Sequence, residues 1–282
     1  MSRSPRSDID PDEWQSGFSN GTGVKTHIIG SKQPRDRVLI GVHGFTDNGQ
    51  CLLPLFNRFT GAYETIAYDV RAHGLSDAPE SGYDLLTLAH DLEQLIDTSE
   101  VSNPILYGYG MGAEIATVVA SRDVIDPVAV IAENPPAPRA AASDPTTRHS
   151  DAEENFDQWR RTPHDQLAHE YGQTPMYASL RATARKQLRP EALAIDERGH
   201  APVDEILPET YDIPTLLLRP DPDMVNYLSP RHDSDIRYSR PSVTVQTIDG
   251  GVGTLHRRFP SETVSAMISF LRDHVSTAPG RT

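Results

Sequence analysis

Four places along the chain gather the residue types that could transfer protons or hold a reacting group. Each directly follows a short apolar run, and the fourth is a pair of late loops. Histidine and carboxylate side chains are the usual proton donors and acceptors of active sites, and glycines allow the backbone to turn sharply. The segments are 43–46 (HGFT), 69–77 (DVRAHGLSD), 108–112 (GYGMG), and the pair 219–223 (RPDPD) and 249–256 (DGGVGTLH).

The elements that must position these segments are short apolar runs that alternate with helical patterns. Such runs suit strands that are buried on both faces of a parallel sheet. Apolar residues recur with helical spacing in 85–96 and again in 264–275. The alternation predicts an α/β fold, with an open, mostly parallel sheet and helices on both of its faces. The expected strands are 37–42, 64–69, 104–109, 127–132, 214–218 and 243–248.

One long excursion interrupts this alternation. Residues 135–210 begin with a Pro/Ala-rich loop and continue with charged, helix-prone sequence. A connection of this length between two strands is too long for a simple loop, and it predicts a helical lid insertion over the C-terminal edge of the sheet, where open α/β sheets bind ligands. The core is then expected to be 23–134 and 211–282, preceded by a polar N-terminal arm, 1–22.

Composition excludes several classes of protein. The formal charge of the 282 residues is −14, and no basic stripe indicates a nucleic-acid partner. No apolar run approaches the roughly 20 residues of a membrane span, and the first residues lack the apolar stretch of a secretory signal, which favours a cytoplasmic protein. The single cysteine, Cys51, excludes an internal disulfide and a cysteine-based zinc site. We expect a small-molecule ligand and neither a metal nor a cofactor; the sequence does not decide the oligomeric state.

The acidic balance has two interpretations. Only three of the 26 basic residues are lysine, against 40 acidic residues. Such a surface holds water and counter-ions and is typical of adaptation to high salt. Alternatively, a GC-rich genome favours arginine over lysine without any physical purpose.

Three motifs, in this order and spacing, resemble the α/β-hydrolase superfamily, most closely its lid-bearing esterases, lactonases and C–C hydrolases. They are HGFTDNG (43–49), YDVRAHGLSDAPESGY (68–83) and GYGMGA (108–113). The resemblance extends over about residues 35–275, and the lid matches only loosely. It implies an α/β-hydrolase fold with an inserted helical lid.

The resemblance also implies where a nucleophile and its base belong. The superfamily places a serine on a sharp strand-to-helix turn, G-x-S-x-G, and a histidine before the last helix takes the serine proton. Here the serine position is Gly110, and the aligned histidine position is Gly253. Both positions are therefore vacated, and no nearby serine falls in a G-x-S-x-G frame. Chemistry through an acyl-serine is not expected.

By the same resemblance, the acid and the oxyanion donors of the superfamily remain. Asp221 fits the acid best, because it follows an expected strand and precedes a proline, and Asp223 is the fallback. Alternatively, Asp221 only caps a turn or pairs with Arg219. The backbone N–H groups of Phe45 and Met111 would hold an oxyanion, and they depend on no side chain.

Other residues have a functional and a structural interpretation. His43, Gly44 and Tyr109 could contact a ligand, although a histidine at this place in the motif usually braces the oxyanion loop, and Tyr109 could simply pack under the lid. His256 could replace the missing histidine as a base, or it could be exposed. The segment 69–77 is expected to fix its own loop through hydrogen bonds.

Two functions from different classes fit these features. The first is a hydrolase-family enzyme with a degenerate Ser-His-Asp triad, acting on a small carbonyl compound such as an ester, a lactone or a cleavable C–C bond, without an acyl-enzyme. The second is a non-catalytic pseudo-hydrolase that binds a small apolar ligand in the former active site. The sequence identifies neither the ligand nor the reaction.

Overall fold

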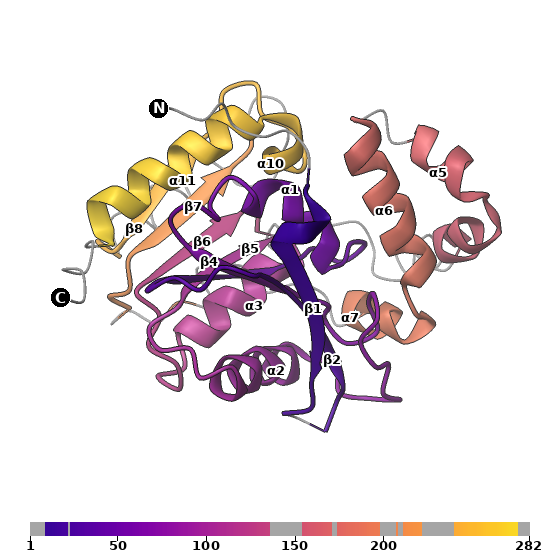
Figure 1. Ribbon diagram of the computed structural model, residues 1–282, viewed down its shortest axis with the longest axis horizontal. Helices are drawn as coiled ribbons and strands as arrows, with labels where there is room; N and C mark the ends of the chain where they lie inside the picture. The colour runs from indigo at the N-terminus through magenta and orange to yellow at the C-terminus, as the bar shows by residue number, and fades with distance from the viewer. Residues whose placement is uncertain are drawn as a thin grey trace.

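The computed structural model shows an eight-stranded sheet with helices packed on both faces (Figure 1). It describes residues 9–21, 23–135, 154–170, 174–197, 207, 211–221 and 240–275. The strand order is β1-β2-β4-β3-β5-β6-β7-β8; the pairs from β4 to β8 are parallel, and β2 is antiparallel to both of its neighbours. The strands are β1 Trp14–Ser19, β2 Thr26–Ser31, β3 Val38–Val42, β4 Glu64–Tyr68, β5 Ile105–Tyr109, β6 Ala129–Glu133, β7 Thr215–Arg219 and β8 Val243–Thr247.

Helices cover the two faces of the sheet and bury two apolar clusters against it. On one face lie α2 (Leu85–Thr98) and α3 (Met111–Ala120), with their stripes of leucine, isoleucine and valine turned to the strands. On the opposite face lie α1 (Leu53–Phe56) and α11 (Pro260–His274). In Figure 1, α11 and the pair α2 and α3 are seen on opposite sides of the strands. The shorter elements are η1 Pro11–Glu13, η2 Gly49–Leu52, η4 Pro190–Ala192 and α10 Leu255–Arg258.

All six expected strands are present, each within two residues of its predicted bounds. The N-terminal segment differs from the expected loose arm, because Trp14–Ser19 forms β1 and pairs along its whole length with β2. The side chains of β1 are mostly exposed apart from Trp14, so the strand has no apolar run. Backbone pairing at the edge of the sheet therefore orders a segment whose hydrophobicity pattern does not predict a strand.

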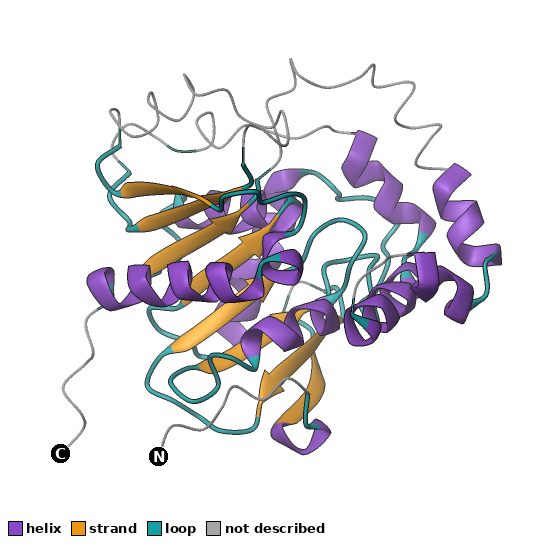
Figure 2. Ribbon diagram, turned by 90° about the horizontal axis from the view of Figure 1, so that it is seen from above, coloured by secondary structure: helices purple, strands orange, loops and turns teal. Residues whose placement is uncertain are grey.

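The described parts of the expected lid are helical. Residues 154–161 form a helix, followed by α5 (His164–Glu170), α6 (Pro175–Gln187) and α7 (Leu193–Glu197). Figure 2 shows these helices grouped beyond one end of the strands. Two contacts identify that end as the carboxyl end of β3: Asn48 donates to Gln187 at 2.8 Å, and the N–H of Arg189 donates to the carbonyl of Ala72 at 2.9 Å. Whether these helices act as a lid stays a prediction.

Candidate active site

The sharp turn between β5 and α3 has the backbone that the sequence predicts. Gly110 follows the last residue of β5 with φ +55° and ψ −124°, and α3 begins at Met111. Close packing fixes this turn, since a β-carbon on Gly112 would lie 2.1 Å from the carbonyl oxygen of Val42. A β-carbon on Gly110 would instead meet no heavy atom within 4 Å. The apex of the turn therefore faces open space.

Two backbone donors border this turn. The N–H groups of Phe45 and Met111 have no hydrogen-bond acceptor among the described residues. Phe45 belongs to the loop after β3, residues 43–49, and the contact of Gly112 with Val42 brings the start of α3 against the start of that loop. Whether these two N–H groups act as oxyanion donors stays a prediction.

Buried histidines and one carboxylate hold the 43–49 loop on its β4 side. His43 uses both ring nitrogens: Nδ1–H donates to the carbonyl of Gly44 at 2.8 Å, and Nε2 accepts from the N–H of Val70 at 3.0 Å. His73 Nε2 lies 2.6 Å from the carbonyl oxygen of Phe45. His43 therefore has no ring nitrogen left for a ligand, and it fixes the loop instead.

Asp69 completes this support. It accepts from the N–H of Gly49 at 2.7 Å and from His27 Nδ1 at 2.8 Å. Burial opposes ionisation, but the hydrogen bonds from His27 and from backbone N–H groups hold the pKa of Asp69 below its ordinary value. Burial also lowers the pKa of His43 to about 3, so its ring is neutral. We call His27, His43, His73 and Asp69 the histidine brace.

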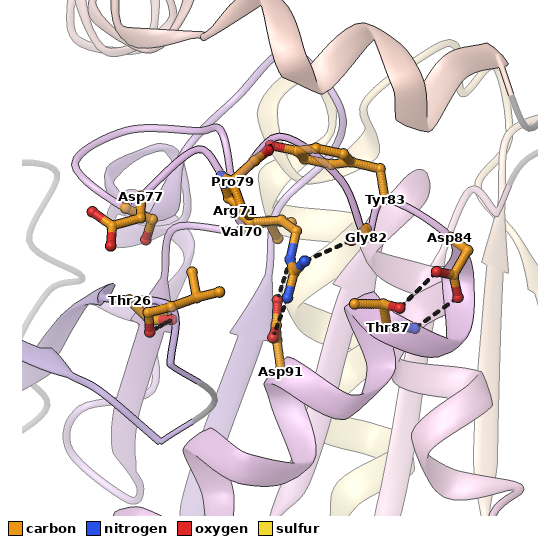
Figure 3. A network of polar contacts seen from close by, with 12 residues as sticks. Thr26, Val70, Arg71, Asp77, Pro79, Gly82, Tyr83, Asp84, Thr87 and Asp91 are labelled. Atoms are coloured by element: carbon orange, nitrogen blue, oxygen red, sulfur yellow. Dashed lines mark hydrogen bonds and ion pairs between the residues drawn. The ribbon is translucent and has the colours of Figure 1, made fainter.

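Arg71 anchors its own loop to α2 (Figure 3). Its Nε and Nη2 donate to the two carboxylate oxygens of Asp91 at 2.6 and 2.7 Å. Its Nη1 donates to the carbonyl of Gly82 at 2.7 Å. This buried, bidentate pair supports the expectation that the segment 69–77 is fixed by its own hydrogen bonds.

A second set of polar contacts holds the 43–49 loop on its opposite side. Arg257, on α10, donates through Nη2 to Asp47 Oδ2 and to the hydroxyl of Tyr109 at 2.6 Å. Arg181, on α6, places its Nε 3.8 Å from Asp47 Oδ1. We call Arg257, Asp47 and Tyr109 the arginine clamp. Tyr109 therefore turns toward α10, and its ring closely approaches Gly44, where a β-carbon would lie 2.6 Å from it.

The two charges of the clamp are fully buried. Burial raises the pKa of Asp47 to about 6, against the opposing influence of Arg181 and His256. Burial lowers the pKa of Arg257 to about 9. The two side chains form a buried ion pair.

His256 is fully buried, which excludes the exposed alternative. Its Nδ1 lies 3.0 Å from both carboxylate oxygens of Glu133, and the hydroxyl of Tyr107 donates to Glu133 Oε2 at 2.7 Å. The N–H groups of Leu255 and His256 also donate to Glu133 Oε1. Burial opposes the ionisation of Glu133, but His256 and Tyr107 hold its pKa below the ordinary value. Nε2 of His256 has no partner among the described residues.

Sequence analysis missed Glu133, Tyr107, Asp47 and Arg257. Glu133 lies at the end of β6, one residue beyond the predicted strand. A carboxylate at the carboxyl end of a buried strand was the available signal. The other three join elements that are far apart in the chain, and no spacing rule connects them.

The late loops join Asp221 to the residues just before Gly253. Asp221 Oδ2 accepts from the N–H of Gly250 at 2.9 Å, and the N–H of Asp221 donates to the carbonyl of Gly251 at 3.0 Å. Asn134 donates to the carbonyl of Gly253 at 3.1 Å. Gly253 has φ +62°, and a β-carbon there would have Arg258 Nε, at 3.9 Å, as its nearest neighbour. The fallback acid, Asp223, lies outside the described residues.

Within the part of the chain that the structure describes, no group of three or more histidine, cysteine, aspartate or glutamate side chains could hold a metal ion. In that same part, no helix has the length and apolar character needed to span a bilayer.

Comparison with known proteins identifies the family. The family described as the alpha/beta hydrolase fold matches residues 37–189, more than half of the chain. The chain therefore belongs to this family, and its eight-stranded, mostly parallel sheet is the α/β-hydrolase fold.

Curated relatives match only part of the chain. A 2-(acetamidomethylene)succinate hydrolase from Mesorhizobium japonicum is 38% identical over 85 residues, which are 30% of this chain and 31% of the relative. Epoxide hydrolase 3 from Xenopus tropicalis is 31% identical over 121 residues, 42% of this chain and 33% of the relative. The matched segments thus span about a third of the length of these relatives.

Solved structures match over most of the chain. An E-2-(acetamidomethylene)succinate hydrolase has a TM-score of 0.74 at 21% identity, covering 92% of this chain and 99% of that one. A variant of an N-formylmaleamic acid deformylase from Pseudomonas putida has a TM-score of 0.75 at 19% identity, covering 90% and 100%. At these identities the likeness establishes the fold alone.

Proposed function

We propose that the protein acts on a small carbonyl compound at the carboxyl end of its sheet, by a route that forms no acyl-enzyme. The observation behind the proposal is the pair of N–H groups, of Phe45 and Met111, that have no acceptor among the described residues and lie near the open apex at Gly110. Such donors stabilise the negative charge that develops on a carbonyl oxygen. The 2-(acetamidomethylene)succinate hydrolase and the N-formylmaleamic acid deformylase, both named for reactions of small carbonyl compounds, support this class of substrate.

In this proposal the triad is degenerate. Gly110 stands at the nucleophile position and Gly253 at the histidine position, while Asp221 is the remaining acid. The contacts of Asp221 with Gly250 and Gly251 support this assignment, because they join the end of β7 to the loop that contains Gly253. With no nucleophilic side chain at the apex, water is the attacking group.

His256 is the proton acceptor that fits best. Glu133 holds its Nδ1, which leaves the buried Nε2, without a partner among the described residues, to take a proton; the rings of Tyr109 and Tyr177 pack beside this histidine. A water molecule would add to the carbonyl carbon while its proton passes to Nε2, and the C=O electron pair would move to the oxygen held by Phe45 and Met111. When the bond to the leaving group breaks, the leaving oxygen or nitrogen takes its electron pair and regains the proton from Nε2.

A single substitution can remove one oxyanion donor. Proline is tolerated at the first position of a helix, and the ψ of −124° at Gly110 avoids the α region that a following proline disfavours. Met111→Pro deletes the N–H, whereas Met111→Ala shortens the side chain but keeps it. On a panel of small esters and lactones, we expect kcat of Met111→Pro to be about 10²–10³-fold below that of Met111→Ala.

The same experiment includes a test for a nucleophilic serine. The wild-type protein should gain no mass after treatment with a fluorophosphonate, because Gly110 offers no nucleophile. A stoichiometric adduct on a serine near the turn would overturn the assignment of Gly110. Equal rates for the two Met111 variants would overturn the role of the backbone donors.

The alternative is a non-catalytic protein that binds a small ligand in this place. The pairing of Arg257 with Asp47 and of His256 with Glu133 favours it, because buried ion pairs also serve purely structural ends. A wild type that turns over no compound of the panel, yet co-purifies with a small molecule seen by mass spectrometry, would support binding without catalysis.

A further inference from the structure

Arg257 connects three separate elements at the site. One nitrogen, Nη2, donates both to Asp47 in the 43–49 loop and to the hydroxyl of Tyr109 at the end of β5. Its guanidinium also lies over the rings of Tyr109, at 5.2 Å, and of Tyr177 on α6, at 6.0 Å. The side chain is 1% exposed, so these contacts take place without competition from water.

Both polar contacts of Arg257 converge on the residues that orient Phe45. The N–H of Asp47 donates to the carbonyl of Gly44 at 3.0 Å, which closes a tight turn with Phe45 inside it. Tyr109 packs so closely on Gly44 that a β-carbon there would overlap its ring. Moving either Asp47 or Tyr109 would therefore move the peptide that presents the N–H of Phe45.

We propose that Arg257 is a positioning residue for the oxyanion donors, and that it fixes the direction of the Phe45 N–H through Asp47 and Tyr109. The inference rests on the proposed function, because it concerns a donor used in carbonyl chemistry. Arginine suits this task better than lysine, because the two N–H bonds of Nη2 are fixed in the guanidinium plane, which also lies over the rings of Tyr109 and Tyr177, whereas a lysine ammonium is a freely rotating point charge. Arg257 itself does not contact the substrate in this proposal.

Arg257→Lys is the direct test. Lysine keeps the positive charge beside Asp47 but cannot reproduce the geometry of the two contacts. We expect kcat on the small-ester panel to fall by about 10²-fold with KM changed less than about threefold, because a displaced donor weakens transition-state stabilisation more than substrate binding. The backbone amide resonance of Phe45 should shift in the same variant.

Arg122→Lys is the matched control. Arg122 Nε donates to the buried carboxylate of Glu93 at 2.8 Å, and this pair joins the segment after α3 to α2, outside the segments 43–49 and 69–77. The variant makes the same substitution in another arginine–carboxylate pair, and its kcat and Phe45 amide resonance should stay near wild type. If Arg257→Lys does not fold, Tyr109→Phe removes only the hydroxyl contact and should still lower kcat by about tenfold without a change in KM.

The outcomes separate the two proposals. A wild type with no activity on the panel would overturn the proposed function, and the inference with it. A wild type that is active, with Arg257→Lys and Tyr109→Phe no more impaired than Arg122→Lys, would overturn the role of Arg257 alone. A kcat loss accompanied by an equal rise in KM would also overturn it, because that pattern indicates lost binding rather than a displaced donor.

Discussion

The 43–49 loop is held on its two sides by different chemistry. On the β4 side, the histidine brace consists of neutral or singly charged groups that bond mainly to backbone N–H and C=O groups. On the α10 side, the arginine clamp is an ion pair between side chains whose residues are 210 positions apart in sequence. The brace therefore ties the loop to the sheet that carries it, whereas the clamp ties it to an element formed by the end of the chain.

The two sides also differ in how fully their polar atoms are used. Among the described residues, no side-chain nitrogen or oxygen of the brace is buried without a partner. On the clamp side, Asp47 Oδ1, Arg257 Nε and His256 Nε2 are buried without a hydrogen bond, although Asp47 Oδ1 lies within ion-pair distance of Arg181. Buried polar groups normally have hydrogen-bond partners, because an unmade hydrogen bond in the interior is costly. The difference indicates that the brace is a fully bonded structural support, whereas the clamp side retains unused hydrogen-bonding capacity.

The largest effect is expected when the vacated positions are refilled. A variant with both Gly110→Ser and Gly253→His should hydrolyse an activated ester about 10²–10⁴-fold faster than either single variant, which is the contribution of a positioned general base. The structure leaves room for both side chains, although each site has a positive φ. Steady-state kinetics on the three variants measures the gain.

Folding controls decide how a negative result is understood. Each substitution should cost about 1–3 kcal/mol of stability, because a non-glycine residue at positive φ is strained. A folded double variant with no activity above background would mean that the loop held by brace and clamp does not place the donors for catalysis, or that Asp221 is not the acid.

The next effect is on stability. Asp47→Asn leaves the guanidinium of Arg257 buried without its counter-charge, and we expect a loss of about 3–5 kcal/mol in the free energy of unfolding. The double variant Asp47→Leu with Arg257→Met removes both charges and should recover most of that loss. Chemical denaturation of the wild type and the two variants measures it. An Asp47→Asn protein as stable as the wild type would show that the clamp is not a coupled pair.

The histidine brace predicts how the free energy of unfolding depends on pH. His43 is neutral in the folded protein, because its Nε2 accepts a hydrogen bond and burial lowers its pKa to about 3. Below pH 6.5 the unfolded chain binds a proton that the folded protein refuses, so stability should fall by about 1.4 kcal/mol per pH unit from this residue alone.

His43→Gln isolates this contribution. The variant should be less stable at pH 7, but its stability should decline less steeply between pH 6.5 and 4. The pKa of Asp47 is raised to about 6, so this residue makes the folded protein more stable as the pH falls. Both proteins contain Asp47, and its contribution therefore cancels when their stabilities are compared. An equal decline in stability of the two proteins with falling pH would contradict a neutral His43 in the folded protein.

The smallest effect is that of salt. The net charge of −14 predicts that stability rises with chloride below about 0.5 M, as the screening length falls and surface carboxylates repel one another less. The loss caused by Asp47→Asn should stay constant over the same range, because a buried pair is screened little. Thermal unfolding in a chloride series tests both statements. A flat response of the wild type would favour the genomic interpretation of its arginine bias.

Local sequence predicted most of the scaffold and part of the site. Apolar runs located six strands, and the glycine pattern located the turn at Gly110, because these features depend on neighbours in the chain. Strands β1 and β2 were both missed. The order of β1 comes from pairing with β2 rather than from burial, and β2 has only two strongly apolar residues, Ile28 and Ile29. The partners of His256 were missed because Tyr107 and Glu133 meet it only when β5, β6 and α10 are assembled.

The crowded turn at Gly110 has a practical consequence for labelling. Its backbone is set by the packing of Gly112 against β3, so the direction of any side chain placed at the apex is fixed before that side chain is chosen. The natural thiol, Cys51, is fully buried, and burial raises its pKa well above the ordinary value, which makes it unreactive. Gly110→Cys would therefore give the protein a single addressable sulfur at the centre of the site, to which disulfide-linked fragments could be tethered to find what the site accepts.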